Sequence, residues 1–226
     1  MIAYADLPLI EQAIRLFAAL ILVTSFALLA QARVVAAIHV FAWQGFLLAA
    51  LTALVAWNSG NEHLYISAVL TLCLKALFIP WLLTRQAKRL GILRELDTVI
   101  RPGLTLMAAG VLVIFCYNVV IPVREFTQAA TRDAIAVSLA LVMIALLMLI
   151  TRRKAVTQVV AFMSLENGLF FAAVAATQGM PMVVELGIAF DVLIAAVIFG
   201  VFFFHIRDSI DTLDVDQLSR LKELED

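Results

Sequence analysis

Four long apolar stretches of this 226-residue sequence contain a polar side chain that could hold or pass on a proton. Glu166, Asp191 and Lys75 each lie in one of them, and His39 and Gln44 share the fourth. Each of the three can be measured from the polar residue at one end of its apolar stretch, namely Lys154, His205 and Arg85. At about 1.5 Å of helical rise per residue, Glu166, Asp191 and Lys75 lie roughly 18, 21 and 15 Å from these residues. Half of a hydrocarbon core is about 15 Å, so these three side chains and Gln44 fall near the bilayer midplane, and His39 is shallower.

An ionisable group at this depth costs about 2.5–3.5 kcal/mol when it faces lipid, so such groups are expected to face protein or water. Burial generally raises the pKa of carboxyl groups and lowers that of amines, which lets neighbouring groups exchange protons near neutral pH. The sequence therefore predicts a proton pathway through Glu166, Asp191, Lys75 and His39, supported by Gln44, Asn167 and Glu185.

Purely structural roles stay open for the same residues. Each carboxyl group could make a fixed hydrogen bond between helices, and Lys75 could form an ion pair with a carboxylate. His39 could be a satisfied packing residue, and Glu185 could lie at the membrane interface. The positions of these side chains in the fold decide between the two interpretations.

Composition excludes several classes of protein. Hydrophobic residues make up 64% and charged residues 15% of the chain, with a mean hydropathy of +1.05, whereas about a quarter of a soluble domain is charged. The net charge of −1 argues against a nucleic-acid partner. Cys73 and Cys116 both lie inside apolar runs, which predicts two small buried residues and neither a disulfide nor a metal site. No cofactor is expected.

The expected fold is an all-α polytopic membrane protein with about seven transmembrane helices, because lipid offers an open strand no hydrogen-bond partners. The hydrophobic segments lie at Leu9–Ala30, Val34–Trp57, His63–Thr84, Gly103–Pro122, Thr131–Ile150, Ala155–Thr177 and Met180–His205. Between the third and fourth segments, Arg85–Arg101 has leucines spaced along one helical face, which indicates an amphipathic helix at the membrane surface; a plain charged loop is the alternative.

Basic residues set the expected orientation. Twelve of the sixteen lie in connections on one side of the membrane, and Arg124 and Arg132 lie on the other. The sequence therefore predicts a cytoplasmic C-terminus and an outer N-terminus, in an inner (cytoplasmic) membrane of bacterial type. The remaining two, Arg15 and Lys75, lie within spans, and Arg15 is expected to pair with Glu11 one turn away.

The first three and last three spans follow the same order of features, which indicates two parallel three-helix repeats joined by an extra helix. Each set has a basic step, then a polar residue before a glycine (Gln44-Gly45; Glu166-Asn167-Gly168), and then one charge in its third helix (Lys75; Asp191). The expected units are an N-terminal unit with the amphipathic segment at residues 1–101, a linking helix at 102–130, and a C-terminal unit with the tail at 131–226. Internal repeats of this kind are common in transport folds.

The C-terminal half also carries a family resemblance. Leu165-Glu166-Asn167-Gly168, the run Val184–Ala189 before Asp191, and the tail Thr212–Val215 resemble the hydrogenase-4 component E family, whose members are membrane subunits of group 4 [NiFe] hydrogenase and formate hydrogenlyase complexes. The same half is similar to the K subunit of complex I and the C subunit of multisubunit antiporters. Their two helical glutamates correspond to Glu166 and, with an aspartate in place of glutamate, to Asp191.

The resemblance implies a subunit without an active site of its own that contributes to proton translocation in an oxidoreductase complex. Its implied partners are antiporter-like and quinone-module-like membrane subunits, which would connect it to a soluble hydrogenase-type arm. Two alternatives remain open: a structural subunit needed for assembly of the membrane arm, or a component of a cation/proton antiporter.

Overall fold

The computed structural model describes residues 9–60, 62–89, 102–122, 129–153 and 155–177, together with Gly187, Val192 and Val197. The elements in these ranges are helical, which confirms the all-α fold class. They are α1 (Leu9–Ala30), α2 (Val34–Ser59), α3 (Glu62–Thr71), the π-helix η2 (Leu72–Phe78), α4 (Ile79–Arg89), α5 (Pro102–Val120), α6 (Ala129–Thr151) and α7 (Ala155–Thr177).

Six helices in the described ranges are long and apolar enough to cross a membrane, and α3, η2 and α4 together form one of them. They correspond to the first six predicted spans, so the chain is a multi-pass membrane protein. The seventh predicted span, Met180–His205, lies almost entirely outside the described residues. The chain divides into compact units at residues 1–188 and 189–226, and all the helices described here belong to the first. The two three-helix repeats therefore stay a prediction.

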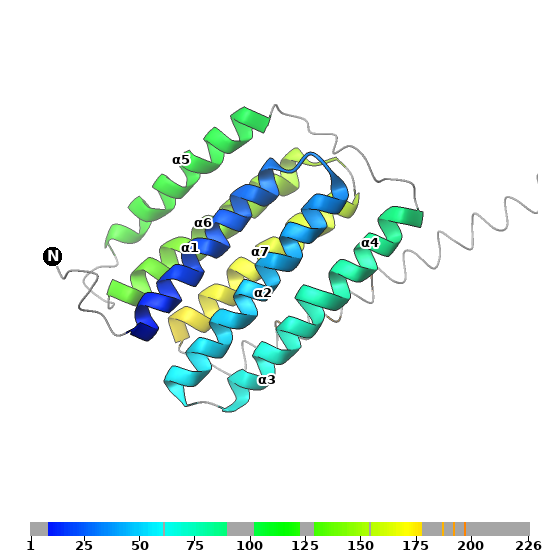
Figure 1. The fold of residues 1–226 in the computed structure, drawn as a ribbon. Coiled ribbons are helices and arrows are strands. Elements are labelled where there is room, and N and C mark those ends of the chain that lie inside the picture. The colour runs from blue at the N-terminus through cyan, green and yellow to red at the C-terminus, as the bar shows by residue number, and fades with distance from the viewer. Residues whose placement is uncertain are drawn as a thin grey trace, which may run out of the picture. The chain divides into compact units, whose positions relative to one another are not determined.

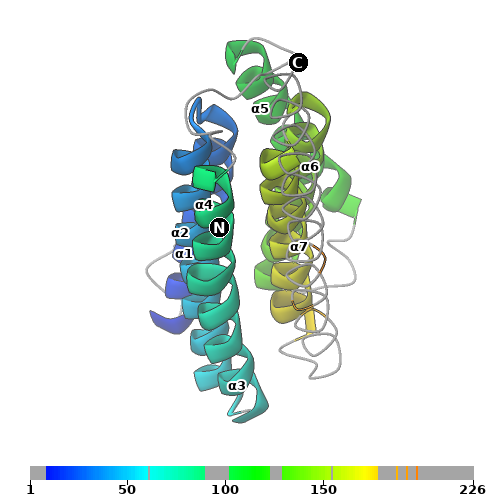
Figure 2. The ribbon, with the colours of Figure 1, turned by 90° about the vertical axis from the view of Figure 1, so that its right-hand side faces the viewer.

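The helices of the first unit form two layers (Figures 1 and 2). One layer contains α1, α2 and the continuous helix α3–η2–α4; the other contains α5, α6 and α7. Across the layers α1 packs on α6 and α2 packs on α7. Among the six spans, α7 has the largest buried share and α5 the smallest. Most side chains of the α7 span are therefore buried by protein, and Glu166 is one of them.

The third span contains a π-helical segment directly before a proline. Pro80 has no N–H group, and its ring clashes with the carbonyl four residues earlier, so the ordinary α-helical bonding is interrupted here. The Ile79 N–H instead donates to the Leu74 carbonyl, five residues back. The sequence alone predicts a kink or an end at Pro80, but the helix continues to Arg89 with a wider turn around Lys75. π-helical turns inside α-helices occur frequently at functional sites.

Two connections are closed by specific hydrogen bonds. Helix α2 ends at Ser59 and is capped by Gly60, whose φ of 66° lies in the left-handed region that glycine adopts without steric cost. The Gly60 N–H donates to the Ala56 carbonyl at 3.0 Å. At the end of α1, the donor comes from a distant part of the chain. Arg152 directly follows α6, and its side chain is buried. Its Nη2 donates to the carbonyls of Leu29 at 2.6 Å and Gln31 at 3.0 Å. Burial lowers the pKa of Arg152 below its ordinary value.

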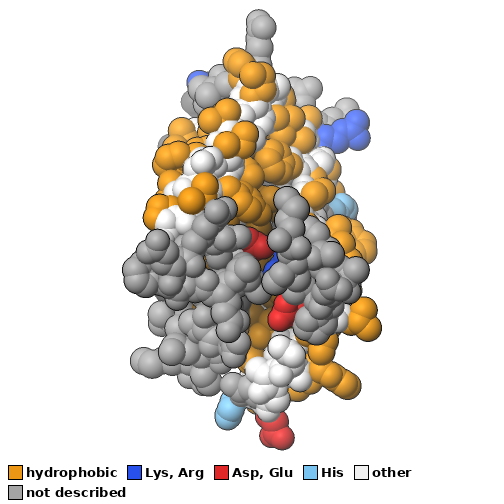
Figure 3. All heavy atoms as spheres, turned by 90° about the vertical axis from the view of Figure 1, so that its left-hand side faces the viewer, with side chains coloured by type: hydrophobic (Ala, Val, Ile, Leu, Met, Phe, Trp, Pro, Cys, Tyr) orange, Lys and Arg blue, Asp and Glu red, His pale blue; other side chains and the backbone are white. Residues whose placement is uncertain are grey.

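The outer faces of the helices suit a lipid environment. Where Figure 3 draws described side chains, they are mostly hydrophobic, with a few acidic and basic side chains near the middle of the face. On α5, Met107, Val111 and Ile114 are each at least 65% exposed. The prediction that both cysteines are buried is wrong for one of them: Cys116 is buried, but Cys73 is exposed. A thiol is apolar enough to face lipid, so its presence in an apolar run could not determine which way it points.

Candidate ionisable site between helices α2, α7 and η2

A buried ion pair lies at the middle of two spans. Lys75 in η2 is thirteen residues from either end of the span Glu62–Lys88, and Glu166 is the twelfth of the 23 residues of α7. Lys75 Nζ lies 2.8 Å from Glu166 Oε1, and the two side chains are 0% and 7% exposed. Two opposite charges at contact distance offset part of the cost of burying each, which explains how both remain in the hydrophobic interior.

Among the described residues, an aromatic ring faces the lysine of this pair, and one oxygen of the carboxylate makes no hydrogen bond. Lys75 Nζ lies 5.3 Å from the centre of the Phe170 ring, one helical turn beyond Glu166, in cation–π geometry. The Oε2 atom of Glu166 is buried and has no hydrogen-bond partner in the described part of the chain. A Cβ atom at Gly187 would lie 3.9 Å from Glu166 Oε1, so Gly187 packs close to this carboxylate.

A chain of hydrogen bonds crosses between the two layers and ends at the residue next to Glu166 in the sequence. Asn167 Nδ2 donates to Gln44 Oε1 at 3.1 Å, and Gln44 Nε2 donates to Ser25 Oγ at 2.7 Å. These bonds connect α7, α2 and α1, and Asn167 adjoins Glu166 in the sequence. All three side chains are buried. The chain therefore fixes the position of α7 beside the ion pair through neutral groups that carry no charge themselves.

Glycines allow the helices to approach at the level of the pair. A Cβ atom at Gly45 would lie 3.0 Å from both the carbonyl carbon and the Cβ of Lys75, so α2 contacts the backbone of η2 directly. A Cβ atom at Gly168 would lie 3.0 Å from the Leu141 Cβ and from the Val142 Cγ2 of α6. Small residues at close helix contacts are typical of membrane proteins. Both polar–glycine motifs seen in the sequence therefore mark close helix packing.

Replacing Gln44 by leucine is expected to lower the free energy of unfolding by about 1–3 kcal/mol, because Asn167 Nδ2 would lose its buried acceptor. The measurement is unfolding in mixed micelles with increasing denaturing detergent. The control is Gln31→Leu. Gln31 is partly exposed, and its Nε2 donates to the Ala27 carbonyl four residues earlier, so its loss removes no bond between helices. Equal losses in the two variants would show that the interhelical chain contributes nothing specific.

The structure brings together four of the predicted residues: Lys75, Glu166, Gln44 and Asn167. It does not bring His39 to them, because this histidine is exposed on α2. Asp191 and Glu185, which the proton pathway and its support also include, lie outside the described residues. Their predicted roles stay predictions.

Sequence reasoning missed two partners. Arg15 Nη1 lies 3.7 Å from Oδ2 of Asp133 on α6, a partner other than the expected Glu11. Ser25 accepts the hydrogen bond from Gln44, although its serine type alone gives no sign of an interhelical role. Asp133 could have been noticed as an acidic residue inside the start of a span, but nothing local to it indicates Arg15. In the described residues, no group of three histidine, cysteine, aspartate or glutamate side chains could hold a metal ion.

The fold and the site together define a polytopic, all-α membrane protein with an ion pair buried at the middle of its helices. The chain is 32% identical over 189 residues to an uncharacterised protein of Mycobacterium tuberculosis, and the alignment covers 83% of this chain and 86% of that protein. It is 26% identical over 182 residues to hydrogenase-4 component E of Escherichia coli, covering 80% and 84% of the two chains. The chain belongs to the hydrogenase-4 component E family. No protein-family model and no solved structure matches it.

Proposed function

We propose that this chain is a membrane subunit of a hydrogenase-type, complex I-related assembly and that its buried ion pair takes part in proton translocation or in its coupling to redox chemistry. Support for the assembly comes from the similarity to hydrogenase-4 component E, named as one component of a hydrogenase. The redox centres would belong to partner subunits. The partners would include antiporter-like and quinone-module-like membrane subunits, in an inner membrane with the N-terminus outside.

The observation that carries the proton role is the Lys75–Glu166 pair itself. Both groups are titratable, both are buried at the middle of a span, and they touch at 2.8 Å. Ionisable residues inside membrane spans are costly and commonly mark ion or proton pathways. Within the described residues Oε2 of Glu166 has no hydrogen-bond partner, so it is a further acceptor at which a proton could arrive. A carboxylate and an amine at this distance can share or exchange a proton as one coupled pair.

The test uses the full assembly, obtained by purification of the tagged chain in mild detergent together with the subunits that co-purify. Reconstituted vesicles are then assayed for redox turnover and, with a pH-sensitive dye, for coupled proton movement. Lys75→Arg is the informative variant, because an arginine keeps the positive charge of the pair but does not release its proton in proteins. We expect assembly and the ion pair to persist while coupled proton movement falls to the background of uncoupled vesicles.

Glu166→Gln should also abolish coupled proton movement, and Glu62→Gln is its matched control. Glu62 is an exposed glutamate at the start of the span that contains Lys75, so its loss of charge should change nothing. The alternative of a purely structural subunit predicts normal coupling in Lys75→Arg whenever the complex assembles. Co-purification with antiporter subunits alone would instead favour a cation/proton antiporter component.

A further inference from the structure

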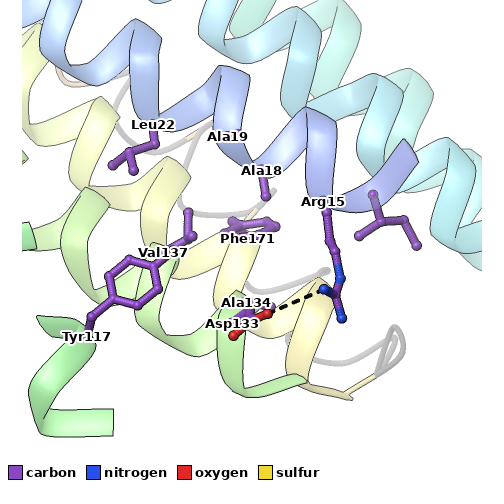
Figure 4. Close-up of a pocket in the computed structure, with 10 residues that line it drawn as sticks. Arg15, Ala18, Ala19, Leu22, Tyr117, Asp133, Ala134, Val137 and Phe171 are labelled. Atoms are coloured by element: carbon purple, nitrogen blue, oxygen red, sulfur yellow. Dashed lines mark ion pairs between the residues drawn. The ribbon is translucent and has the colours of Figure 1, made fainter. Parts of the chain in front are cut away.

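A pocket of about 360 Å³ lies between α1, α5, α6 and α7, apart from the ion pair. Figure 4 shows Arg15 and Asp133 together at one end of it, and Leu22, Val137 and Tyr117 toward the other. The charged side chains are 25% and 34% exposed, so both remain accessible. Ala18 and Phe171 line the pocket between the two ends.

The pocket and the buried hydrogen-bond chain follow one another along the same two helices. On α1, Leu22 in the pocket precedes Ser25 in the chain by about 4.5 Å of helical rise. On α7, Phe171 in the pocket follows Asn167 in the chain by about 6 Å. On each of these helices the pocket is therefore about one turn from a member of the chain, and on α7 that member, Asn167, adjoins Glu166 in the sequence.

We propose that this pocket is a water-filled vestibule, open toward the side of the membrane at which α1 begins and closed at its inner end by the apolar side chains of Leu22 and Val137. Its ligand is water, and Asp133 and Arg15 hydrate its mouth. The link to proton movement rests on the proposed function, because the vestibule would bring water to within one turn of the chain that ends beside Glu166.

Charge and size favour water over an acyl chain. Asp133 is the first residue of the span Asp133–Thr151, and Arg15 is the seventh residue of α1, so the pair lies near one end of the two spans. An ionised group within a span, such as Arg15, almost always faces protein or water. A single water needs about 10–15 Å³ of accessible volume and two to four polar partners, and the pocket volume exceeds this many-fold. The Arg15 guanidinium and the Asp133 carboxylate place charged groups from α1 and α6 at one end of the pocket.

The test is thiol labelling of the full chain in native membrane vesicles of both orientations, with Cys73 and Cys116 replaced by alanine. The probe is a charged, membrane-impermeant methanethiosulfonate. Leu22→Cys places a thiol at the inner end of the pocket, and Val23→Cys places one at the same depth on the outer surface of α1, where valine is 62% exposed. Asn58→Cys, at the exposed end of α2, reports which side of the vesicle the mouth faces.

We expect Leu22→Cys to react about tenfold faster than Val23→Cys, and from the same side as Asn58→Cys, because only a thiolate reacts and a thiol facing lipid stays protonated. Ala19→Cys, a milder change in the same pocket, should label likewise if Leu22→Cys impairs folding. Absence of labelling at both pocket positions, labelling from the opposite side only, or rates equal to that of Val23→Cys would overturn the proposal. Labelling does not depend on proton movement, so normal coupling in Lys75→Arg would remove the proton role and leave the vestibule intact.

Discussion

Replacing Lys75 by methionine is expected to lower the free energy of unfolding by about 3–5 kcal/mol, because the Glu166 carboxylate would remain buried without its counter-ion. Methionine keeps the length of the side chain, so the loss reports mainly the charge. The measurement is the detergent-denaturation midpoint and slope in mixed micelles. Lys88→Met is the matched control, since Lys88 is exposed near the end of the same span and its replacement should change the free energy by at most about 0.5 kcal/mol.

The double variant Lys75→Met with Glu166→Leu distinguishes the attraction within the ion pair from the cost of burying a charge without a partner. Removing both partners of a buried ion pair and filling the space with apolar side chains is often neutral or stabilising by about 1–4 kcal/mol. We therefore expect the double variant to recover most of the stability that Lys75→Met loses. A double variant as unstable as the single one would contradict the view that the buried, uncompensated charge causes the loss.

If the double variant is as stable as the natural sequence, the pair contributes little net stability. Its presence at the middle of two spans then calls for another explanation than holding the helices together. That outcome would favour the proton role, because in the structural alternative the pair serves only to stabilise the packing of η2 against α7.

Replacing Gly45 by alanine is the second large effect. The new Cβ would lie 3.0 Å from the backbone carbonyl carbon and from the Cβ of Lys75, and a backbone cannot rotate away as a flexible side chain can. Overpacking of this kind costs about 1–3 kcal/mol and moves the neighbouring segment. We expect η2 to shift away from α2 and the 2.8 Å contact between Lys75 and Glu166 to lengthen.

Gly110→Ala on α5 is the control for the Gly45 variant. It makes the same chemical change inside another span, at a glycine where an added Cβ meets nothing within 4 Å. Because alanine favours helix over glycine by up to about 1 kcal/mol, this control should be neutral or slightly stabilising. The measurements are the unfolding free energy and the coupled proton movement of the assembly. Similar losses at both glycines would contradict a specific contact between α2 and η2.

Hydropathy was sufficient to locate six helices, because lipid imposes the same demand on every residue of a span. The boundaries of α1 and α7 agree with those predicted, at Leu9–Ala30 and Ala155–Thr177. The π-helical segment could not be predicted in the same way, since it depends on how the helix absorbs Pro80 while it packs on Gly45. The sequence shows that a proline interrupts the helix, but it does not show whether the helix kinks, ends or widens into a π-helical turn, because that depends on the packing of neighbouring helices.

The candidate site was predictable by residue type and depth, and an ion pair of Lys75 with a carboxylate was one of the alternatives, but the sequence did not show which carboxylate. Lys75 and Glu166 stand out in the sequence as charges inside apolar runs, yet 91 positions separate them and only the packing of η2 beside α7 brings them together. His39 has a comparable sequence signal and is exposed on α2. An ionisable residue in a span therefore indicates a site, while the face of the helix on which it lies decides whether it joins that site.

The bonds from Arg152 to the carbonyls of Leu29 and Gln31 have a consequence for biogenesis. The residues that terminate α1 are made early, but the guanidinium that satisfies their carbonyls emerges from the ribosome only about 120 residues later. Until then these carbonyls lack this donor, and the end of α1 lacks the contact that joins it to the end of α6. Completion of α6 thus becomes the step at which the early helices are committed to their final arrangement.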